Sequence, residues 1–350
     1  MKKYIKIILV TILALGLSAC GSSYKKHEAT MYDSFDTVIK LTAYTKSEDD
    51  FKKFEEIYKD EFTRLHKLYD PYKNYESITN VKTINDKAGI EPVKVDKDLF
   101  SLIKLSKDYY EKYGQKTNIN MGAVTNIWKD YRDNALNNKV AAIPSMEELK
   151  AADSYTDLND VVLNEDKLEV YLKNKENFLD LGAVAKGYAT EIVANKLSKE
   201  GLEAGIINAG GNVRTIGNPD LIGKDSWKIA IQNPNLNKEP EKQYIATYKA
   251  GEESMVTSGN YQRFYEYEGK VYHHIIDPDT LMPANNFKSV TIITKDSSLA
   301  DFLSTTVFIS DYETGKKLVD SIDGVEAVWV FPDDRIEYTK NLESKLEIVD

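Results

Sequence analysis

The sequence predicts an α+β fold in which mixed, largely antiparallel sheets pack against helices. Short strand patterns and amphipathic helical patterns follow one another irregularly, without the strand–helix repeat of a parallel sheet. The glycine pair at 210–211 predicts a tight hairpin between two of the strands. Cys20 is the single cysteine, so no internal disulfide can form and the fold must rest on a buried core.

The N-terminal segment predicts export. Lysines at 2, 3 and 6 precede an apolar run over 7–17, which is too short for a permanent membrane span. Residues 1–19 are therefore predicted to be a signal peptide. The sequence at 17–21 resembles a bacterial lipobox, in which a cysteine thiol receives diacylglycerol before cleavage.

Cys20 is accordingly expected to be the lipidated start of the mature chain, anchored in the cell membrane on its extracytoplasmic face. Residues 20–30 are polar and without periodicity, so they are expected to form a lipidated tether. The folded domain is expected over 31–350. An ordinary signal peptide with an incidental cysteine is the alternative.

The charge balance argues against nucleic acid as a partner. The chain carries a net charge of −10, and no basic stripe interleaved with aromatic residues offsets it. A polyphosphate ligand would therefore need locally arranged cations, backbone donors or a metal ion.

One strand and three helices are predicted in the first part of the chain. Residues 37–45 alternate apolar and polar side chains, as a half-buried strand does. From Ser47 to Tyr69 the apolar residues recur at threes and fours, and Ser47 is the expected N-cap. Similar helices are predicted over 98–113 and 122–131.

Beyond residue 160 short strands dominate, and two helices interrupt them. The helices are predicted near 183–199 and 298–309. The strands are predicted at 161–163, 168–172, 227–231, 244–248, 271–276, 290–294 and 327–331.

The first motif with chemical potential spans 179–189. A strand is predicted to end at Asp180 and a helix to begin near Ala183. A helix N-terminus presents free N–H groups and a positive dipole end, which suit an anion. Lys186 would add a full positive charge beside a phosphate group. A plain strand-to-helix turn with an exposed lysine explains the pattern equally well.

The second motif is the pair Gly210 and Gly211. Glycines permit a sharp turn or the close approach of backbone to a ligand. On the pattern alone, a hairpin is the more ordinary interpretation.

The third motif contains two of the four histidines, His273 and His274, side by side in a predicted strand. Neighbouring strand residues point to opposite faces, so one is expected to face a site and the other the core or solvent. A neutral imidazole can take a proton from a hydroxyl nucleophile. No further His or Cys lies at ligand spacing, so a zinc site is not expected. A packed, hydrogen-bonded histidine is the alternative.

The fourth motif places Asp301 and Thr305 one helical turn apart on one face. A carboxylate, a hydroxyl and a backbone carbonyl are the hard oxygen ligands that Mg²⁺ prefers. An aspartate that caps the start of the helix is the alternative.

Taken in order, these motifs resemble the ApbE family of FAD:protein FMN transferases. The resemblance runs from about Phe35 to about Thr306, which is nearly the whole mature chain. It rests on the segments 35–37, 69–71, 118–128, 180–187, 210–211, 257–259, 274–278 and 301–305.

The resemblance implies a site that binds FAD and Mg²⁺. The flavin and pyrophosphate of FAD would lie against Phe35, Tyr69, Thr117, Asn118, Asp180, Lys186 and the backbone near Ile275, with Tyr69 as the aromatic wall. Mg²⁺ would be held by the Ala183 carbonyl, Asp301 and Thr305, with Ser304 as a further contributor. His274 would be the catalytic histidine.

The implied reaction is Mg²⁺-dependent transfer of FMN from FAD to a Thr or Ser hydroxyl of an exported acceptor flavoprotein, with release of AMP. One alternative is hydrolysis of FAD to FMN and AMP at the same metal site. Another is a lipoprotein that binds flavin without turnover. The chain has no convincing copy of an acceptor motif, so it is not expected to flavinylate itself.

Four residues depart from the commoner family pattern. Asn118, Asn212 and Asn260 stand where aspartate is usual, which removes negative charge but keeps hydrogen-bonding capacity. These changes bear on nucleotide affinity more than on chemistry. Leu281 stands where glycine is usual, which bears on the geometry of the turn.

Overall fold

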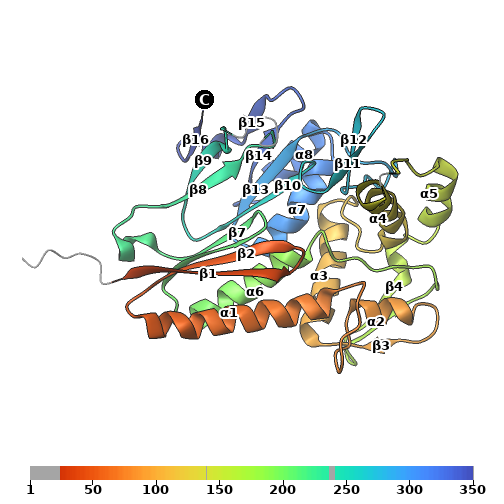
Figure 1. Ribbon diagram of the computed structural model, residues 1–350, viewed down its shortest axis with the longest axis horizontal. Helices are drawn as coiled ribbons and strands as arrows, with labels where there is room; N and C mark the ends of the chain where they lie inside the picture. The colour runs from red at the N-terminus through yellow and green to blue at the C-terminus, as the bar shows by residue number, and fades with distance from the viewer. Residues whose placement is uncertain (1–23, 139, 236–240, 350) are drawn as a thin grey trace, which may run out of the picture.

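A large antiparallel sheet forms the centre of the molecule (Figure 1). The computed structural model describes residues 24–138, 140–235 and 241–349. Neighbouring strands are antiparallel throughout the sheet. Its strands, in spatial order, are β1 (Lys25–Ser34), β2 (Thr37–Thr45), β6 (Ala204–Ala209), β7 (Asn212–Gly217), β10 (Ser254–Gly259), β13 (Ser289–Thr294), β14 (Glu326–Val330) and β15 (Ile336–Tyr338). The predicted α+β class is confirmed.

Helices cover one face of this sheet. Apolar side chains of β2, such as Ile39 and Leu41, are buried in the same core as Tyr58 and Phe62 of the long helix below them. Burial of this continuous apolar layer is the main stabilising contribution to the fold. The helices that share in it are α1 (Glu48–Tyr69), α3 (Lys97–Tyr113), α6 (Ala185–Lys199), α7 (Ser297–Ile309) and α8 (Tyr312–Asp320).

A smaller antiparallel sheet covers the opposite face. Trp227 and Tyr248 from this sheet pack with Met255 and Ile293 of the central sheet in a second core. The two sheets therefore share a dry interface, and both faces of the central strands are buried. The strands of the smaller sheet are β16 (Leu346–Ile348), β9 (Tyr244–Ala250) and β8 (Trp227–Gln232).

The remaining elements surround one end of the central sheet (Figure 1). Trp128 stacks on Tyr272 in a third, local core that joins a helix to a hairpin. These elements are α2 (Val81–Asp86), α4 (Gly122–Asn137), α5 (Met146–Asp153), β3 (Val93–Lys94), β4 (Val161–Asn164), β5 (Glu169–Leu172), β11 (Phe264–Tyr267), β12 (Lys270–His273) and the 3₁₀ turn Leu158–Asp160. Two further 3₁₀ turns, Pro219–Ile222 and Lys340–Leu342, pack in the second core beside the smaller sheet.

Most predicted elements lie within a few residues of their observed bounds. The Ser47 side chain accepts the Asp50 N–H and starts α1, as its place ahead of the periodic run predicts. The helix predicted over 122–131 continues to Asn137. The strand predicted over 271–276 ends at His273.

Two expectations are corrected. The expected tether over 20–30 is wrong from Lys25 onward, because Lys25 to Thr30 pair with β2 as the edge strand β1. An edge strand made of polar residues is hard to predict from sequence, because only its inward face needs apolar side chains. On that face of β1, Ala29 is buried and His27 stacks on Phe51. Cys20 and the predicted signal peptide lie outside the described residues.

The second correction concerns 179–185. No strand ends at Asp180, although α6 begins at Ala185, two residues from the predicted start near Ala183. The segment has no regular structure before a turn at 182–184 and is held by single hydrogen bonds: the Asp180 N–H donates to the Ile119 carbonyl (2.8 Å), and the Leu179 N–H to the Asn85 side chain (2.8 Å).

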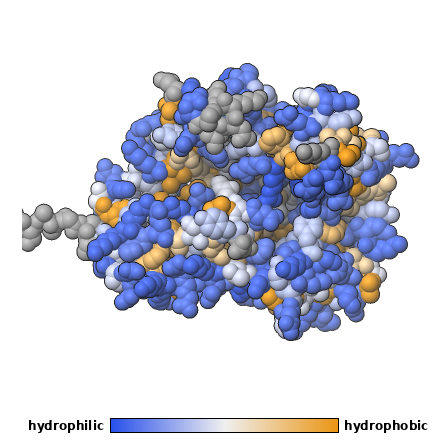
Figure 2. All heavy atoms as spheres, viewed as in Figure 1, coloured by the Kyte–Doolittle hydropathy of each residue, from blue (hydrophilic) through white to orange (hydrophobic). Residues whose placement is uncertain are grey.

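The surface agrees with the acidic, polar composition. Hydrophilic residues dominate the face shown in Figure 2, and apolar residues there lie in small scattered groups. None of the described helices is both long enough and apolar enough to cross a membrane.

Helices α6 and α7 touch most closely at Gly187. A Cβ atom there would lie 2.3 Å from the Ser297 carbonyl oxygen and 2.4 Å from the Asp301 Cβ, so only glycine fits. Its N–H donates to the Asp301 carboxylate (2.7 Å), which is buried. The glycine therefore fixes the distance between the two helices.

We expect Gly187→Ala to lower the free energy of unfolding by about 1–3 kcal/mol, because the overpacking outweighs the better helix propensity of alanine. Urea unfolding followed by circular dichroism measures the change. Gly251→Ala is the control, since the nearest atom to its added Cβ lies 4.0 Å away. Equal stability of Gly187→Ala and wild type would contradict this account of the contact.

Candidate active site

A cavity of about 840 Å³ opens at the end of the central sheet, between the β1–β2 turn, α4, the start of α6, α7 and the β11–β12 hairpin. This volume is within the range of pockets that hold small molecules and cofactors. Of the residues predicted for the site, eleven line the cavity: Phe35, Tyr69, Thr117, Asn118, Asp180, Ala183, Lys186, His274, Ile275, Asp301 and Thr305. Ser304 does not line it.

The β1–β2 turn brings an aromatic residue to the cavity in a strained conformation. Phe35 and Asp36 both have positive φ (56° and 50°), and Ser34 pairs with Thr37 across them. A two-residue turn with both residues left-handed suits the strand twist, but a bulky side chain rarely adopts it. The Phe35 ring packs against Phe62 and His66. Such strain is typical of functional sites.

Tyr69 forms an apolar wall next to this turn. Its ring centroid lies 6.3 Å from that of Phe35 and 6.4 Å from that of Tyr188. Burial raises the pKa of the phenol, so the ring is neutral. Its hydroxyl has no hydrogen-bond partner among the described residues, which is unusual for a buried phenol. A ligand atom in the cavity could supply one.

Thr117 and Asn118 have side chains that already serve the fold. The Thr117 hydroxyl bonds to that of Thr306 (2.8 Å). Asn118 donates to the Thr156 carbonyl (2.8 Å) and accepts the Asn120 N–H (2.8 Å). The amide in place of the usual aspartate can make both bonds, whereas a carboxylate could not donate to a carbonyl.

Asp180 and Lys186 stand at the start of α6. The Asp180 carboxylate accepts the Gly182 N–H (2.8 Å); burial raises its pKa, while that hydrogen bond and the charges of Arg263 and Lys186 oppose the rise. Lys186 donates to the Gly182 carbonyl (3.4 Å) and has no carboxylate within 4.0 Å in the described part of the chain. Its charge is available for an anion at the helix N-terminus.

Three oxygen donors meet where α6 begins. In a regular helix the Gly187 N–H would bond to the Ala183 carbonyl, but it donates to Asp301 Oδ2 instead. Ala183, Asp301 and Thr305 all line the cavity, and the Thr305 hydroxyl also bonds to that of Ser258 (3.3 Å). This donor set fits Mg²⁺, which takes few protein ligands and keeps several waters.

Ser304 fits the proposed metal site less well. Its hydroxyl donates to the Asp301 carbonyl (2.9 Å) and bonds to the Ser258 hydroxyl (2.8 Å), and the residue is fully buried. Within the described ranges no three His, Cys, Asp or Glu side chains gather at metal-binding distance. A cation here would therefore rest on one carboxylate with neutral oxygens.

The two adjacent histidines point to opposite sides, as the alternation along a strand predicts. His273 is 2% exposed and lies in the core. Its Nδ1 accepts the Ile275 N–H (3.2 Å), so its protonated Nε2 donates to the Ala284 carbonyl (2.6 Å). Ile275 is thus held on both sides, since its carbonyl accepts the Ala284 N–H (3.0 Å). The backbone near Ile275 was expected to contact the ligand, but both the Ile275 N–H and its carbonyl are already paired.

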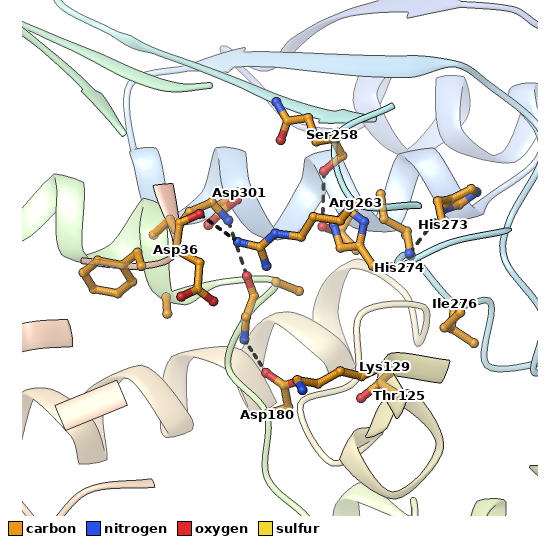
Figure 3. A pocket seen from close by; sticks show the side chains of 18 of the residues that line it. Asp36, Thr125, Lys129, Asp180, Ser258, Arg263, His273, His274, Ile276 and Asp301 are labelled. Atoms are coloured by element: carbon orange, nitrogen blue, oxygen red, sulfur yellow. Dashed lines mark hydrogen bonds between the residues drawn. The ribbon is translucent and has the colours of Figure 1, made fainter. Parts of the chain in front are cut away.

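His274 faces the cavity, as Figure 3 shows. Burial, together with the positive charge of Arg263, lowers its pKa to about 3. Its Nδ1 is buried without a partner among the described residues. At neutral pH the side chain is therefore an uncharged imidazole whose second nitrogen can accept a proton.

The sequence profile of the ApbE family matches residues 35–329. The chain belongs to the ApbE family. The family predicted from the ordered motifs is confirmed.

Relatives of this ApbE-family chain are named for an enzyme. A FAD:protein FMN transferase of Treponema pallidum is 28% identical over 98% of this chain and 95% of its own length. One of Klebsiella pneumoniae is 29% identical over 78% of this chain and 84% of its own. The enzyme class predicted from the motifs is the one that both names give.

Solved ApbE structures share the fold. The ApbE protein of Thermotoga maritima superposes with a TM-score of 0.80 at 26% identity, covering 92% of this chain and 99% of its own. The flavin transferase ApbE of Vibrio cholerae gives a TM-score of 0.74 at 20% identity, covering 92% and 100%, which bears on the fold alone.

The sequence analysis missed several residues that line the ApbE cavity. Arg263 lies between the segments 257–259 and 274–278 but was given no role, and the cations Lys129 and Arg132 come from the middle of α4. Asn212, noted only as a departure, is 1% exposed and its Nδ2 has no partner among the described groups. The available signal for Arg263 was a positive charge between two of the motif segments in a chain that is acidic overall.

The burial of His273 predicts an acid-sensitive fold. Its pKa is about 4 when folded, against 6.5 for the free side chain, because burial disfavours the charged ring. Between these values the unfolded chain binds the extra proton, so stability is full above pH 6.5 and falls as the pH drops toward 4. The loss should reach about 3 kcal/mol.

Urea unfolding at several pH values between 7.5 and 4 measures this loss. His273→Gln should show a smaller fall than wild type, with the contribution of His274 common to both proteins. Parallel curves for the two proteins would contradict the assignment.

Proposed function

We propose that this protein transfers FMN from FAD to a Thr or Ser hydroxyl of an exported acceptor protein, releases AMP, and requires Mg²⁺. The observation that carries the proposal is one cavity that is lined by an uncharged histidine, by a lysine at a helix start without a carboxylate partner among the described residues, and by the oxygen-bearing residues Ala183, Asp301 and Thr305. The names of the family relatives support the donor and the group transferred.

FAD would be bound by groups that the fold leaves without partners. The Phe35 and Tyr69 rings offer an apolar surface for the isoalloxazine, and the Tyr69 hydroxyl can bond to a polar ligand atom. Lys186, in the first turn of α6, would pair with the pyrophosphate, where helix dipole and side-chain charge act together.

Mg²⁺ would be held by the Ala183 carbonyl, Asp301 and Thr305. When bound, it would neutralise charge on the pyrophosphate and make AMP a better leaving group. The chain itself sets the geometry, because the Gly187 N–H holds Asp301 in place from the neighbouring helix.

His274 would act as the general base. The acceptor hydroxyl gives its proton to the imidazole while its oxygen forms a bond to the FMN phosphorus. The bond between that phosphorus and the bridging oxygen breaks, and AMP leaves with the electron pair. The products are a phosphoester-linked flavoprotein and AMP.

The base is weak in the free protein, because burial and neighbouring cations hold the pKa of His274 low. The negative charge of bound FAD would offset Arg263 and Lys186 and raise that pKa. Proton abstraction would therefore be favoured only after FAD is in place.

The testing experiment incubates the protein with FAD, with Mg²⁺ or EDTA, and with or without an exported flavoprotein acceptor. In-gel flavin fluorescence detects transfer, and chromatography detects AMP. We expect acceptor labelling and AMP release that both require Mg²⁺. His274→Ala should lose transfer by about 100-fold or more, since it removes the general base, yet still bind FAD.

His27→Gln is the matched control, because His27 lies on β1 away from the cavity. AMP and free FMN without labelled protein would make the protein an FAD hydrolase. FAD binding without either product would make it a flavin-binding protein, and both results contradict transfer.

We also propose that Cys20 carries a lipid that anchors the protein to the extracytoplasmic face of the membrane. The support is the lipobox-like sequence, together with a folded body that begins at β1 only a few residues later.

Growth with an alkyne-labelled fatty acid tests the anchor. The wild-type chain should take up the label, and Cys20→Ser should not, because the acceptor thiol is gone. Ser23→Ala is the control and should remain labelled. Label retained in Cys20→Ser would refute the lipid anchor.

A further inference from the structure

Arg263 crosses the cavity from beside His274 toward Asp36, as Figure 3 shows. It lies in the short segment between β10 and β11, and its guanidinium donates to the Asp36 carbonyl at 3.4 Å. That contact is long, and the residue is exposed to the cavity and solvent. A guanidinium carries five N–H donors, so most of its hydrogen-bonding capacity is unused.

Arg263 differs in this respect from the other arginines of the chain. Each of those lies within 4.0 Å of a carboxylate: Arg64 with Glu61, Asp96 and Asp98, Arg132 with Asp133, Arg214 with Glu191, and Arg335 with Glu337. For Arg263 the described residues provide no such partner. An arginine left unpaired inside a pocket is suited to bidentate binding of an oxyanion.

The positive charge of Arg263 acts on both His274 and Asp180. It is the leading electrostatic cause that lowers the pKa of His274, after burial, and it also opposes the raised pKa of Asp180. Lys186 on α6 and Arg132 on α4 face His274 as well, and Asp36, Asp180 and Asp301 are carboxylates that line the same cavity. The guanidinium therefore lies within electrostatic reach of the base and of the start of α6.

The backbone ties Arg263 to the histidine. Phe264 pairs with His273 across the β11–β12 hairpin, so Arg263 and His274 are the next opposed positions. The His274 N–H donates to the Arg263 carbonyl (3.2 Å). Because one hairpin carries both residues, the guanidinium and the imidazole keep a fixed relative position.

We infer that Arg263 is a catalytic residue, whose guanidinium binds the pyrophosphate oxygens of FAD and holds the reacting phosphoryl group against His274. The inference rests on the proposed function and adds, to the anion contact of Lys186 on α6, a second one from the segment between β10 and β11. Charge that develops on the phosphoryl oxygens would be stabilised there by donors already in position. The weak contact to Asp36 is given up when the anion binds.

The test compares Arg263→Ala and Arg263→Lys with wild type, and Arg335→Ala serves as the control because Arg335 lies outside the cavity. Transfer at saturating FAD should fall by about 100-fold or more in both Arg263 variants, the lysine included, since an ammonium cannot bind two oxygens in the same plane. Added guanidinium ion should restore part of the rate in Arg263→Ala. Arg335→Ala should transfer at the wild-type rate.

A pH–rate profile separates this role from a structural one. Loss of the positive charge should raise the pKa of His274, so the acid limb of the Arg263→Ala profile should move to higher pH. Calorimetry with ADP, which has the pyrophosphate but no flavin, should show weaker binding by Arg263→Ala than by wild type.

A folded Arg263→Lys protein that transfers at the wild-type rate would overturn the inference, and so would ADP binding equal in Arg263→Ala and wild type. Circular dichroism of each variant checks the fold. If wild type itself fails to transfer, the proposed function fails, and the ADP comparison still decides whether Arg263 binds pyrophosphate.

Discussion

The buried hydrogen bond from the Gly187 N–H to the Asp301 carboxylate is the contact on which the site depends. It joins the start of α6 to the first turns of α7, at a place where no side chain larger than hydrogen fits between them. It also takes from the Ala183 carbonyl the N–H that a regular helix would give it. A single interaction thus sets the helix spacing, orients the carboxylate and leaves a carbonyl unbonded in the cavity. The fold and the site cannot vary independently here.

The β11–β12 hairpin gives its two histidines different tasks. His273 bridges Ile275 and Ala284 from inside the core, and this holds the loop that follows His274. The same loop contains Leu281, which has a positive φ (60°) where a glycine would adopt it without strain. Leu281 is 4% exposed, and its carbonyl accepts the Trp128 indole N–H (2.9 Å). Burial and this hydrogen bond offset the strained backbone, which explains how the unusual residue is tolerated.

Sequence patterns predicted the parts of the fold that local physics determines. Apolar spacing and the Ser47 cap predict the α1 helix. The hairpin at Gly210 and Gly211 is predicted by glycines, which tolerate the positive φ angles found there (60° and 97°). Lys25 to Thr30 gave no such signal, because an edge strand of polar residues is defined only by its partner β2. The segment at Asp180 has a strand-like sequence pattern, but its N–H groups bond to Ile119 and to the Asn85 side chain, and not to a neighbouring strand. Ser304 has a suitable hydroxyl and spacing, yet Ser258, distant in sequence, takes it. Arg263 was hidden for a related reason: what distinguishes it is the lack of a carboxylate neighbour, and neighbours are a property of the tertiary structure.

The length of β1 also limits how far the cavity can lie from the N-terminal end of the folded body. β1 has 10 residues and runs from the N-terminal end of the folded body to the turn at the cavity, a length of about 30 Å. From Cys20 to Tyr24 the chain can reach at most about 15 Å. If Cys20 is anchored, the mouth of the cavity stands no more than about 45 Å above the lipid surface. If the protein also transfers FMN as proposed, acceptors would have to present their hydroxyl within that layer, so membrane-bound proteins with short ectodomains would meet the enzyme more readily than proteins diffusing far from the bilayer.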